Sequence, residues 1–284
     1  MADTYVQHKG NLSAADASTN RRASPAIWSD CPVERIMLDP GVGYGHQDDF
    51  SGGGYDFATN TAVTQIGEYE IFTGNGPSLA GSVTIPGAQT FVSGTSADVA
   101  AQMVLGGGAP FVISDTAGAD KKLWFEARFK ISAVVDADQV QFFIGLTEED
   151  RSVANGTFAD AGGDLGFTTT IDLLGFGRFD NDGDSLSLCY QKASQTAQDT
   201  LQNAIAADTY IKCGFVYDPA ADTAKRISVF FDNVINGTFV TGTNIAAATF
   251  PDAEELTMVI AVQNDSTTTN TLTVDWWRCF QLSP

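Results

Sequence analysis

Two segments with a strict two-residue alternation constrain the fold of this chain more than any other feature. The first runs from Leu123 to Ile131, and its apolar positions are Leu123, Phe125, Ala127, Phe129 and Ile131. The positions between them are Trp124, Glu126, Arg128 and Lys130. Val140–Leu146 repeats the pattern through Val140, Phe142, Ile144 and Leu146. Successive side chains of a strand point to opposite faces, so each segment predicts a β-strand with one face in a core.

Further short segments of this kind are separated by loops rich in Gly, Asp, Asn and Thr. They are Leu173–Phe179, Leu186–Gln191, Tyr210–Tyr217, Ile227–Phe231, Leu256–Val262 and Leu272–Leu282. Only Ser194–Ala206 has weak helical character, through Leu201 and Ile205, and we expect a loop with one turn of helix there. Many strands without long helices predict an all-β chain of two antiparallel sheets packed face to face. No low-complexity linker divides residues 48–284, so we expect one domain.

The segment before this domain, residues 1–47, lacks the strand pattern. It begins with a polar stretch that includes the pair Arg21-Arg22. A short helix is predicted at Val33–Leu38, ended by Asp39, Pro40 and Gly41. Such a segment cannot bury much apolar surface by itself, so we expect an extended N-terminal arm that lies against another surface. The alternative is that the arm packs back on its own domain.

The net charge of −20 restricts the partners of the chain. Residues 1–50 hold 4 basic and 7 acidic groups, which leaves −17 for the remainder. A field of this sign repels nucleic acid and anionic membranes, so neither is expected as a partner. No apolar run reaches the roughly 18 residues of a membrane span. The four cysteines lack CxxC spacing and only His8 and His46 could complement them, so we expect no zinc site and no cofactor.

Candidate catalytic carboxylates are few. Glu68 and Glu70 are two residues apart and would share a face, but the third acid of an E-x-D-x-x-E glucanase strand is missing. Glu148, Glu149 and Asp150 follow a strand and would point to opposite faces. No GxSxG, HExxH or P-loop sequence occurs. We therefore expect no enzymatic activity.

The acidic run from Asp180 to Asp184 superficially resembles a calcium loop. An EF-hand loop needs Gly at position 6 and a bidentate acid at position 12. Here Gly183 falls at position 4 and Gln191 at position 12. Because the run connects two predicted strands, we interpret it as a hairpin turn and predict no metal site.

Four segments, in order along the chain, carry a resemblance to a known group of proteins. They are Leu123–Glu148, Tyr210–Tyr217 (YIKCGFVY), Ile227–Val234 (ISVFFDNV) and Thr257–Trp277. They resemble strand pairs of phage and environmental-virus proteins with a concanavalin A-like fold. The resemblance implies an antiparallel jelly-roll sandwich and a virion structural role, commonly head decoration. One departure is Asn233-Val234, at a hairpin position where the family usually has Gly.

The resemblance leads to a first functional hypothesis, a non-enzymatic capsid decoration protein of a bacteriophage. The expected partners are the major capsid protein and other copies of this chain, with a trimer as the natural symmetry at a three-fold capsid position. The protein would be made in the bacterial cytoplasm and would lie on the outer surface of the head. The arm would supply the capsid contacts, through Tyr5, Arg21, Arg22, Ile27 and Trp28.

The alternative hypothesis is a carbohydrate-binding, lectin-like module, or a tail or fibre adhesion protein, on the same fold. Such a module needs exposed aromatic residues that stack on sugar rings of surface glycans. Strand parity makes Trp124, Phe143 and Trp277 the candidates. Of the pair Trp276-Trp277, one indole should lie in the core and the other on the opposite face, where the arm could also cover it. A glycoside hydrolase that uses Glu68 or Glu70 is the third hypothesis.

Overall fold

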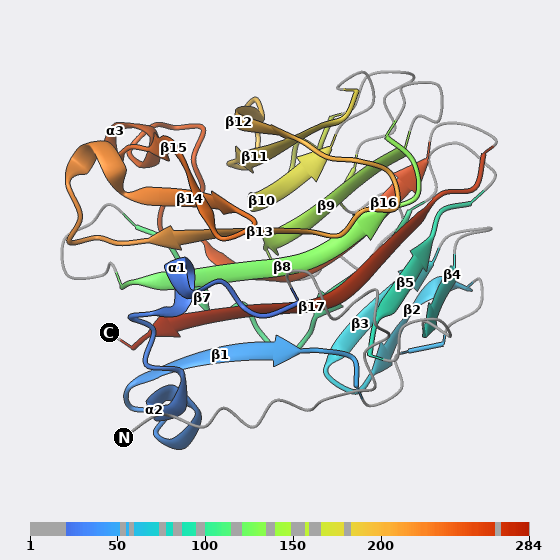
Figure 1. Cartoon of the computed structure of the whole chain (residues 1–284), viewed down its shortest axis with the longest axis horizontal. Coiled ribbons are helices and arrows are strands. Elements are labelled where there is room, and N and C mark those ends of the chain that lie inside the picture. Colours follow the sequence, from blue (N-terminus) through green and yellow to red (C-terminus); the bar gives the residue numbers. More distant parts are fainter. Residues whose placement is uncertain are drawn as a thin grey trace.

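A computed structural model describes residues 21–51, 55–56, 60–73, 78–81, 87–94, 100–114, 121–134, 140–148, 157–158, 166–178, 183–264 and 268–283. Two antiparallel sheets lie face to face and make up most of this part of the chain (Figure 1). The eight-stranded sheet has the order β15-β14-β13-β8-β17-β5-β4, and β1 also pairs with β17. The nine-stranded sheet has the order β12-β11-β10-β9-β16-β6-β3-β2, and β7 also pairs with β16. The predicted all-β sandwich is thus confirmed.

The element bounds are as follows. The eight-stranded sheet contains β1 (Gly43–Asp48), β4 (Ser78–Gly81), β5 (Gln89–Val92), β8 (Leu123–Ile131), β13 (Ile211–Tyr217), β14 (Ile227–Phe231), β15 (Val234–Val240) and β17 (Thr271–Leu282). The nine-stranded sheet contains β2 (Asn60–Ile66), β3 (Tyr69–Thr73), β6 (Ala101–Leu105), β7 (Phe111–Val112), β9 (Val140–Thr147), β10 (Leu173–Arg178), β11 (Ser185–Gln191), β12 (Gln198–Ala204) and β16 (Glu255–Asn264). The helices are α1 (Pro25–Trp28), α2 (Val33–Leu38), α3 (Gly242–Ile245) and the 3₁₀ turn η2 (Thr223–Lys225).

Every strand predicted from alternation is present within a few residues of its expected ends, and α2 has the predicted bounds. The prediction of a loop with a helical turn at Ser194–Ala206 is wrong, because Gln198–Ala204 forms β12 and pairs with β11. The free hydrogen-bonding groups at the edge of β11 override a weak local preference. In the β14–β15 turn, Asp232 and Asn233 both have positive φ, 48° and 71°. Asp and Asn tolerate this conformation, so the hairpin forms without the family's Gly.

The main core lies between the sheets and is made by the inward positions that the alternation predicts. On β8, Phe125 and Phe129 are fully buried, and on β9 so are Phe142 and Ile144. Phe125 and Phe215 stack with their ring centroids 5.3 Å apart. The outer face of the nine-stranded sheet carries a second, smaller cluster that includes Phe143, Phe158 and Phe167.

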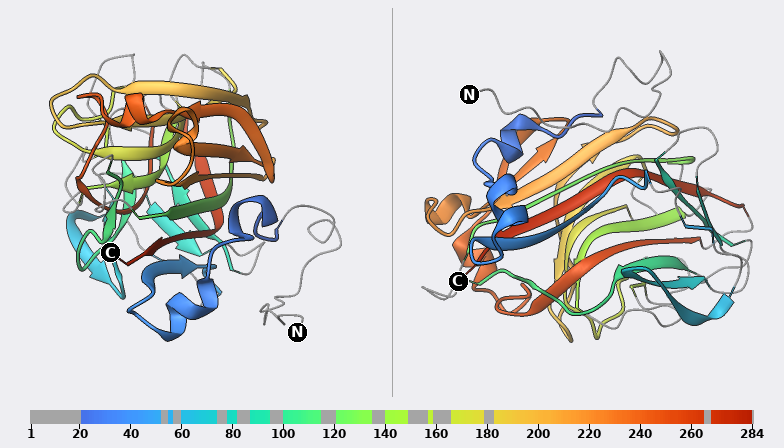
Figure 2. Two further views of the ribbon diagram at one scale, coloured as in Figure 1. Left: turned by 90° about the vertical axis from the view of Figure 1, so that its left-hand side faces the viewer. Right: turned by 90° about the horizontal axis from the view of Figure 1, so that it is seen from below.

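The described part of the arm packs on its own sandwich, as the alternative interpretation predicted. Residues 21–42 run across the outer face of the eight-stranded sheet, where α1 lies over β8 (Figure 2). Ile27, Val33 and Ile36 join Trp124, Val216, Phe230 and Phe280 in a third buried cluster. The chain then enters the sheet itself as β1, which pairs with β17 from Gly43↔Leu282 to Asp48↔Trp277. Residues 43–47 therefore belong to the sandwich, although the expected domain boundary followed residue 47.

Buried polar contacts hold the arm in place. Glu126 on β8 is fully buried and accepts hydrogen bonds from Ser24 N at 3.2 Å and from Trp28 Nε1 at 2.6 Å. Asp275 forms ion pairs with Arg21 at 2.8 Å and with Arg128 at 2.6 Å. A bulge in β17 between Val274 and Trp276 interrupts the pairing with β8 at Asp275. The outward positions of β8 thus anchor the arm, which alternation alone does not reveal.

Candidate functional site

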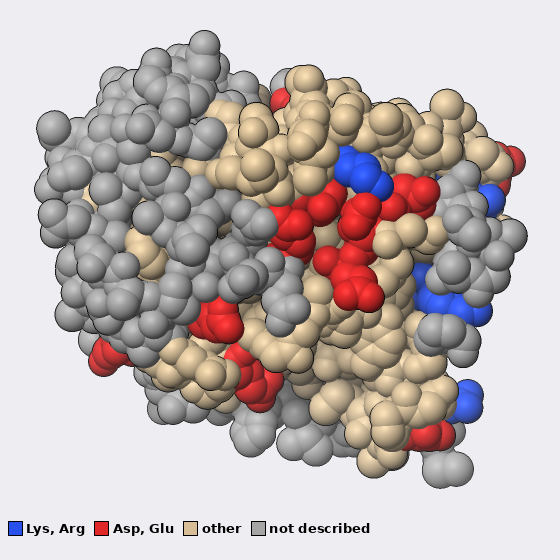
Figure 3. All heavy atoms as spheres, turned by 180° about the vertical axis from the view of Figure 1, so that it is seen from behind, with Lys and Arg blue, Asp and Glu red and all other residues tan. Residues whose placement is uncertain are grey.

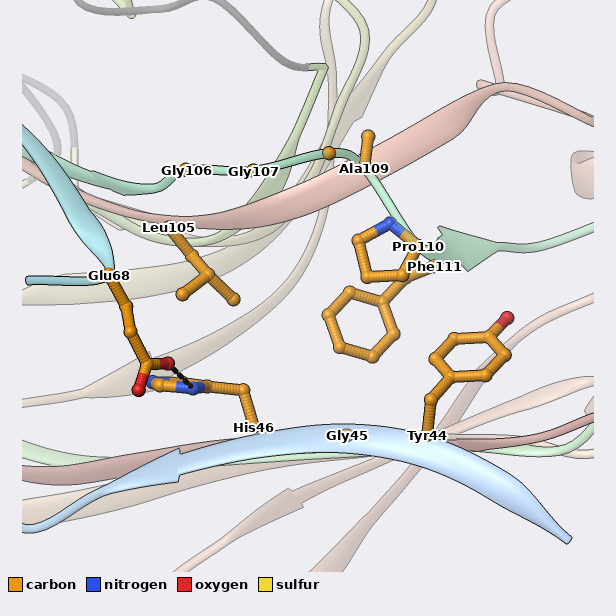
Figure 4. Close-up of a pocket in the computed structure, with 11 residues that line it drawn as sticks. Tyr44, Gly45, His46, Glu68, Leu105, Gly106, Gly107, Ala109, Pro110 and Phe111 are labelled. Atoms are coloured by element: carbon orange, nitrogen blue, oxygen red, sulfur yellow. Dashed lines mark ion pairs between the residues drawn. The ribbon is translucent and has the colours of Figure 1, made fainter. Parts of the chain in front are cut away.

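A cavity of about 490 Å³ lies at one edge of the sandwich, between β1 of one sheet and the β6–β7 connection of the other. Its described lining residues are Tyr44, Gly45, His46, Glu68, Leu105, Gly106, Gly107, Gly108, Ala109, Pro110 and Phe111. Figure 4 shows Tyr44 and His46 rising from β1, with Glu68 reaching toward His46 from the β2–β3 turn. A cavity of a few hundred Å³ matches the size of small-molecule sites in proteins.

The sequence of β1 directs its side chains into this cavity. Tyr44 and His46 are two residues apart and therefore share the face that lines it. Gly45 lies between them, and a Cβ there would overlap the Phe280 ring and the carbonyl oxygen of Cys279. A larger residue at position 45 would therefore push β1 away from β17.

Three consecutive glycines form the opposite wall. Gly107 and Gly108 have φ values of 86° and 122°, which side-chain-bearing residues rarely adopt. A Cβ at either position would meet nothing within 4 Å, so packing does not require glycine here. The backbone conformation requires it instead, and the result is a stretch of bare main chain that a ligand could approach closely.

The aromatic part of the cavity is held in a fixed orientation. Tyr44 lies 5.9 Å from Phe111 between ring centroids, at an interplanar angle of 39°. The Tyr44 hydroxyl donates to Gln281 Oε1 at 2.9 Å, and Gln281 Oε1 also accepts from Val112 N at 2.9 Å. The Tyr44 ring is half-buried, whereas Phe111 is fully buried behind it. Tyr44 therefore offers a ring surface that is already ordered before any ligand arrives.

Four titratable side chains form a chain of polar contacts that begins in the cavity lining with Glu68 and His46 and continues behind it to Tyr69 and Asp48. His46 Nδ1 lies 3.2 Å from Glu68 Oε2, and His46 Nε2 lies 2.7 Å from the Tyr69 hydroxyl. Tyr69 donates to Asp48 Oδ2 at 2.9 Å and accepts from Trp277 Nε1 at 3.3 Å. When Tyr69 donates to Asp48, His46 Nε2 must donate to Tyr69, and a neutral imidazole then has no proton to share with Glu68. The strength of the contact between His46 and Glu68 therefore depends on whether His46 Nδ1 carries a proton.

Burial shapes the proton affinities of this chain. It lowers the pKa of His46, although Glu68 and Asp48 act in the opposite direction. Burial raises the pKa of Asp48, although the hydrogen bonds from Phe50 N and Tyr69 act to lower it. Burial also raises the pKa of Tyr69 well above its ordinary value. The tendency is to keep the buried members of the chain neutral.

We expect the imidazole of His46 to titrate below about pH 6.5, the ordinary midpoint of histidine. The unfolded chain then binds a proton at pH values where folded His46 does not. The contribution of His46 to the free energy of unfolding is thus full above about pH 6.5 and is lost as the pH falls. NMR titration of the imidazole resonances, with His8→Gln for assignment, measures the midpoint. Glu68→Gln should lower it further, and a wild-type midpoint at or above 6.5 would show that burial does not dominate.

The three aromatic residues predicted to face a glycan are buried in different parts of the structure. Trp124, Phe143 and Trp277 are 1%, 0% and 0% exposed, so the prediction of a glycan-facing surface made from these three is wrong. The arm covers Trp124, the cluster with Phe158 and Phe167 covers Phe143, and Trp277 lies in the main core. Trp276 lies on the opposite face and donates to Arg21 O at 2.8 Å. The indole outside the core is thus the one beneath the arm.

Among the predicted capsid contacts, Ile27 is 1% exposed and packs on the sandwich, so its role as a contact is wrong. Trp28 and Arg21 are half-buried in the same interface, Arg22 is exposed, and Tyr5 lies outside the described residues. Glu68 lines the cavity, whereas Glu70 is not among the lining residues and lies beside Gly106. Glu148 is half-buried, whereas Glu149, Asp150 and Asp180–Asp182 fall outside the described part.

Sequence reasoning missed Tyr44, His46, Asp48 and Tyr69 as a group. The alternation of Tyr44, His46 and Asp48 was the available signal, but it crossed the expected boundary, with Tyr44 and His46 in the segment assigned to the arm and Asp48 at the start of the domain. Among the described residues, no group of three His, Cys, Asp or Glu side chains could hold a metal ion. No helix in that part of the chain is long and apolar enough to cross a membrane.

Acidic side chains gather on one face of the described surface (Figure 3). Figure 3 shows several Asp and Glu side chains gathered near the centre of the face opposite the view of Figure 1, with few Lys or Arg side chains. Together with the net charge of −20, this distribution disfavours the approach of anionic ligands.

The two-sheet topology defines the fold of this chain, an antiparallel sandwich similar to that of concanavalin A-like lectins and glucanases. An endo-1,3-beta-glucanase from Streptomyces sioyaensis is 12% identical, with 84% of this chain and 96% of that chain covered and a TM-score of 0.51. A protein of unknown function from Shewanella oneidensis is 15% identical, covering 93% and 97%, with a TM-score of 0.48. Peanut lectin is 14% identical, covering 84% and 99%, with a TM-score of 0.47. No protein-family model and no curated protein matches the sequence.

Proposed function

We propose that this protein is a non-enzymatic carbohydrate-binding protein and that the cavity beside β1 is its sugar site. The observation that carries the proposal is the combination of an ordered Tyr44 ring with the Glu68–His46 pair in a cavity of about 490 Å³. Sugars have apolar ring faces and polar rims, and this combination can bind both.

The geometry of β1 fits one sugar ring. Tyr44 and His46 are two residues apart, so their Cα atoms are separated by about 7 Å along an extended strand. A pyranose that stacks on Tyr44 would therefore bring one edge near His46 and Glu68. Its hydroxyl groups could donate to the Glu68 carboxylate, while the bare backbone of Gly107 and Gly108 leaves space on the other side.

Two further observations support binding without hydrolysis. Of the described residues that line the cavity, only Glu68 carries a carboxylate, whereas glycoside hydrolysis usually uses a pair of acids flanking the bond. The neighbouring Glu70 lies beside Gly106 and is not one of the lining residues. The glucanase with the same fold supports a carbohydrate ligand by analogy only, because one fold hosts many functions.

We expect Tyr44→Ala to weaken binding of the best ligand found on a glycan array by about fivefold to tenfold, since one stacking contact of about 1 kcal/mol is lost. Isothermal titration measures the change. Phe239→Ala is the matched control, because Phe239 is a half-buried aromatic residue on β15, away from the cavity lining. Silence of the wild-type protein across the array would overturn the proposed function, and equal affinity of the Tyr44→Ala variant would overturn the proposed site.

A second candidate function is attachment to a phage head or another large assembly. It is favoured by four exposed large apolar side chains in the described part of the chain, Met37, Leu38, Val234 and Ile235, of which Leu38 is 85% exposed. Exposed apolar side chains indicate a protein contact when they form one contiguous patch, and here they occur as two adjacent pairs, one on α2 and one at the start of β15. Co-sedimentation with phage heads that lack the protein separates this function from free glycan binding.

A further inference from the structure

We infer that the cavity selects sugars that carry a free ammonium group, such as hexosamines without an acetyl group, over neutral and acidic sugars. This inference rests on the proposed carbohydrate binding and names the ligand class of the same site. It follows from the charges around the cavity, the position of the Glu68 carboxylate and the aromatic ring opposite it.

The charges around the cavity favour a cation. The described lining contains Glu68 and His46 but no Lys or Arg. Asp48 accepts a hydrogen bond from Tyr69, and Glu70 lies beside Gly106. Glu68 is thus the one carboxylate of the described lining, and burial favours the neutral form of the single imidazole next to it. A uronic or sialic acid would bring a further negative charge to this place, and the net charge of −20 adds to the repulsion.

The Glu68 carboxylate is available to a ligand. Its side chain is 72% exposed, and the contact with His46 uses Oε2. The backbone of Glu68 is fixed, because its carbonyl oxygen accepts from Gly106 N at 2.8 Å. Oε1 can thus accept a charge-assisted hydrogen bond from an ammonium group, a stronger contact than one from a hydroxyl.

The aromatic wall favours an organic cation over a metal ion. The Tyr44 ring surface attracts an ammonium group or the polarised C–H groups next to it. A hard metal ion requires several oxygen ligands, and no cluster of three or more His, Cys, Asp or Glu side chains that could hold one occurs among the described residues. A sugar ring that stacks on Tyr44 and bears an ammonium group at its edge can contact both the Tyr44 ring and the Glu68 carboxylate. A simple alkylamine could bind the Glu68 carboxylate but has no ring to stack on Tyr44.

The test is titration calorimetry at pH 6, where sugar amines are protonated, with glucosamine trimer, N-acetylglucosamine trimer, galacturonic acid trimer and n-butylamine. We expect the glucosamine trimer to bind at least about tenfold more tightly than the acetylated trimer. Glu68→Gln should abolish this preference, because it weakens binding of the glucosamine trimer more than binding of the acetylated trimer. The control Glu34→Gln removes an exposed charge on α2 and should preserve the preference. At pH 8 the preference should shrink as the amine loses its proton.

The outcomes separate the inference from the proposed function. Equal affinity for the two hexosamine trimers overturns the inference while the proposed function stands. Tighter binding of the galacturonic acid trimer also overturns it. If n-butylamine binds as tightly as the glucosamine trimer, the recognised group is the amine alone and the sugar assignment fails. If no saccharide binds the folded wild-type protein, here or on the array, both the inference and the proposed function fail.

Discussion

Glu126→Ala is expected to lower the free energy of unfolding by about 3–5 kcal/mol, because it breaks a buried charge network by removing one partner. Glu126 is fully buried and holds three groups: the Ser24 amide, the Trp28 indole and the Arg278 guanidinium, the last at 3.3 Å. Without the carboxylate, Arg278 loses its ion pair with Glu126 in a buried position. The Cζ atom of Arg278 lies 4.1 and 5.1 Å from the ring centroids of Trp28 and Trp276, and neither ring replaces the lost negative charge.

The same substitution should release the arm, since two of the three lost contacts come from residues 24 and 28. Urea unfolding measures the stability, and the rate of trypsin cleavage after Arg22 reports the release of the arm. Glu34→Ala on α2 is the control and should change stability by less than about 0.5 kcal/mol, because Glu34 is exposed. A variant that loses stability but keeps the wild-type cleavage rate would show that Glu126 supports the sheet rather than the arm.

Trp277→Ala is the second substitution with a large expected effect, about 3–5 kcal/mol of unfolding free energy. Trp277 is fully buried between the sheets and stacks on Tyr69, with centroids 6.0 Å apart and an interplanar angle of 29°. Its indole also donates to the Tyr69 hydroxyl, and His46 contacts the same ring edge-on at 6.4 Å. The substitution opens a cavity directly behind the proposed sugar site.

We therefore expect Trp277→Ala to weaken both stability and sugar binding, because Tyr69 and His46 lose their support. Trp277→Phe is the matched variant. It keeps most of the aromatic contact and loses the hydrogen bond, so the expected cost is nearer 1–2 kcal/mol. Thermal unfolding and titration with the best array ligand measure the two effects. Unchanged sugar affinity in a folded Trp277→Ala protein would contradict the link between the core and the site.

The sequence predicted the sandwich well because alternation is a local property. On β8, β9 and β14 the apolar positions specify both the strand and its inward face, and the predicted bounds differ from the observed ones by at most one residue. The β12 strand was missed because its local sequence is ambiguous. Only its pairing with β11, a contact made through the tertiary structure, selects the extended form.

The site was not predictable in the same way, because it is assembled from three distant segments. Tyr44 and His46 come from β1, Glu68 from a turn, and Gly106–Gly108 from the connection between β6 and β7. Strand parity correctly indicated that Trp124 points away from the main core. It could not reveal that the arm covers that face and buries the ring, which depends on the contacts of Glu126 and Asp275 with residues 21–28.

The most direct test of the central claim is an NMR titration of isotope-labelled protein with the best ligand from the glycan array. Binding at the proposed site predicts the largest shift changes at the amides of Gly106, Gly107 and Gly108 and at the His46 imidazole. Amides of the arm, such as those of Ile27 and Trp28, should change little. Changes centred on the arm, or on the outer face of the nine-stranded sheet around Phe143, with Gly107 and His46 unaffected, would contradict the assignment of the sugar site to this cavity.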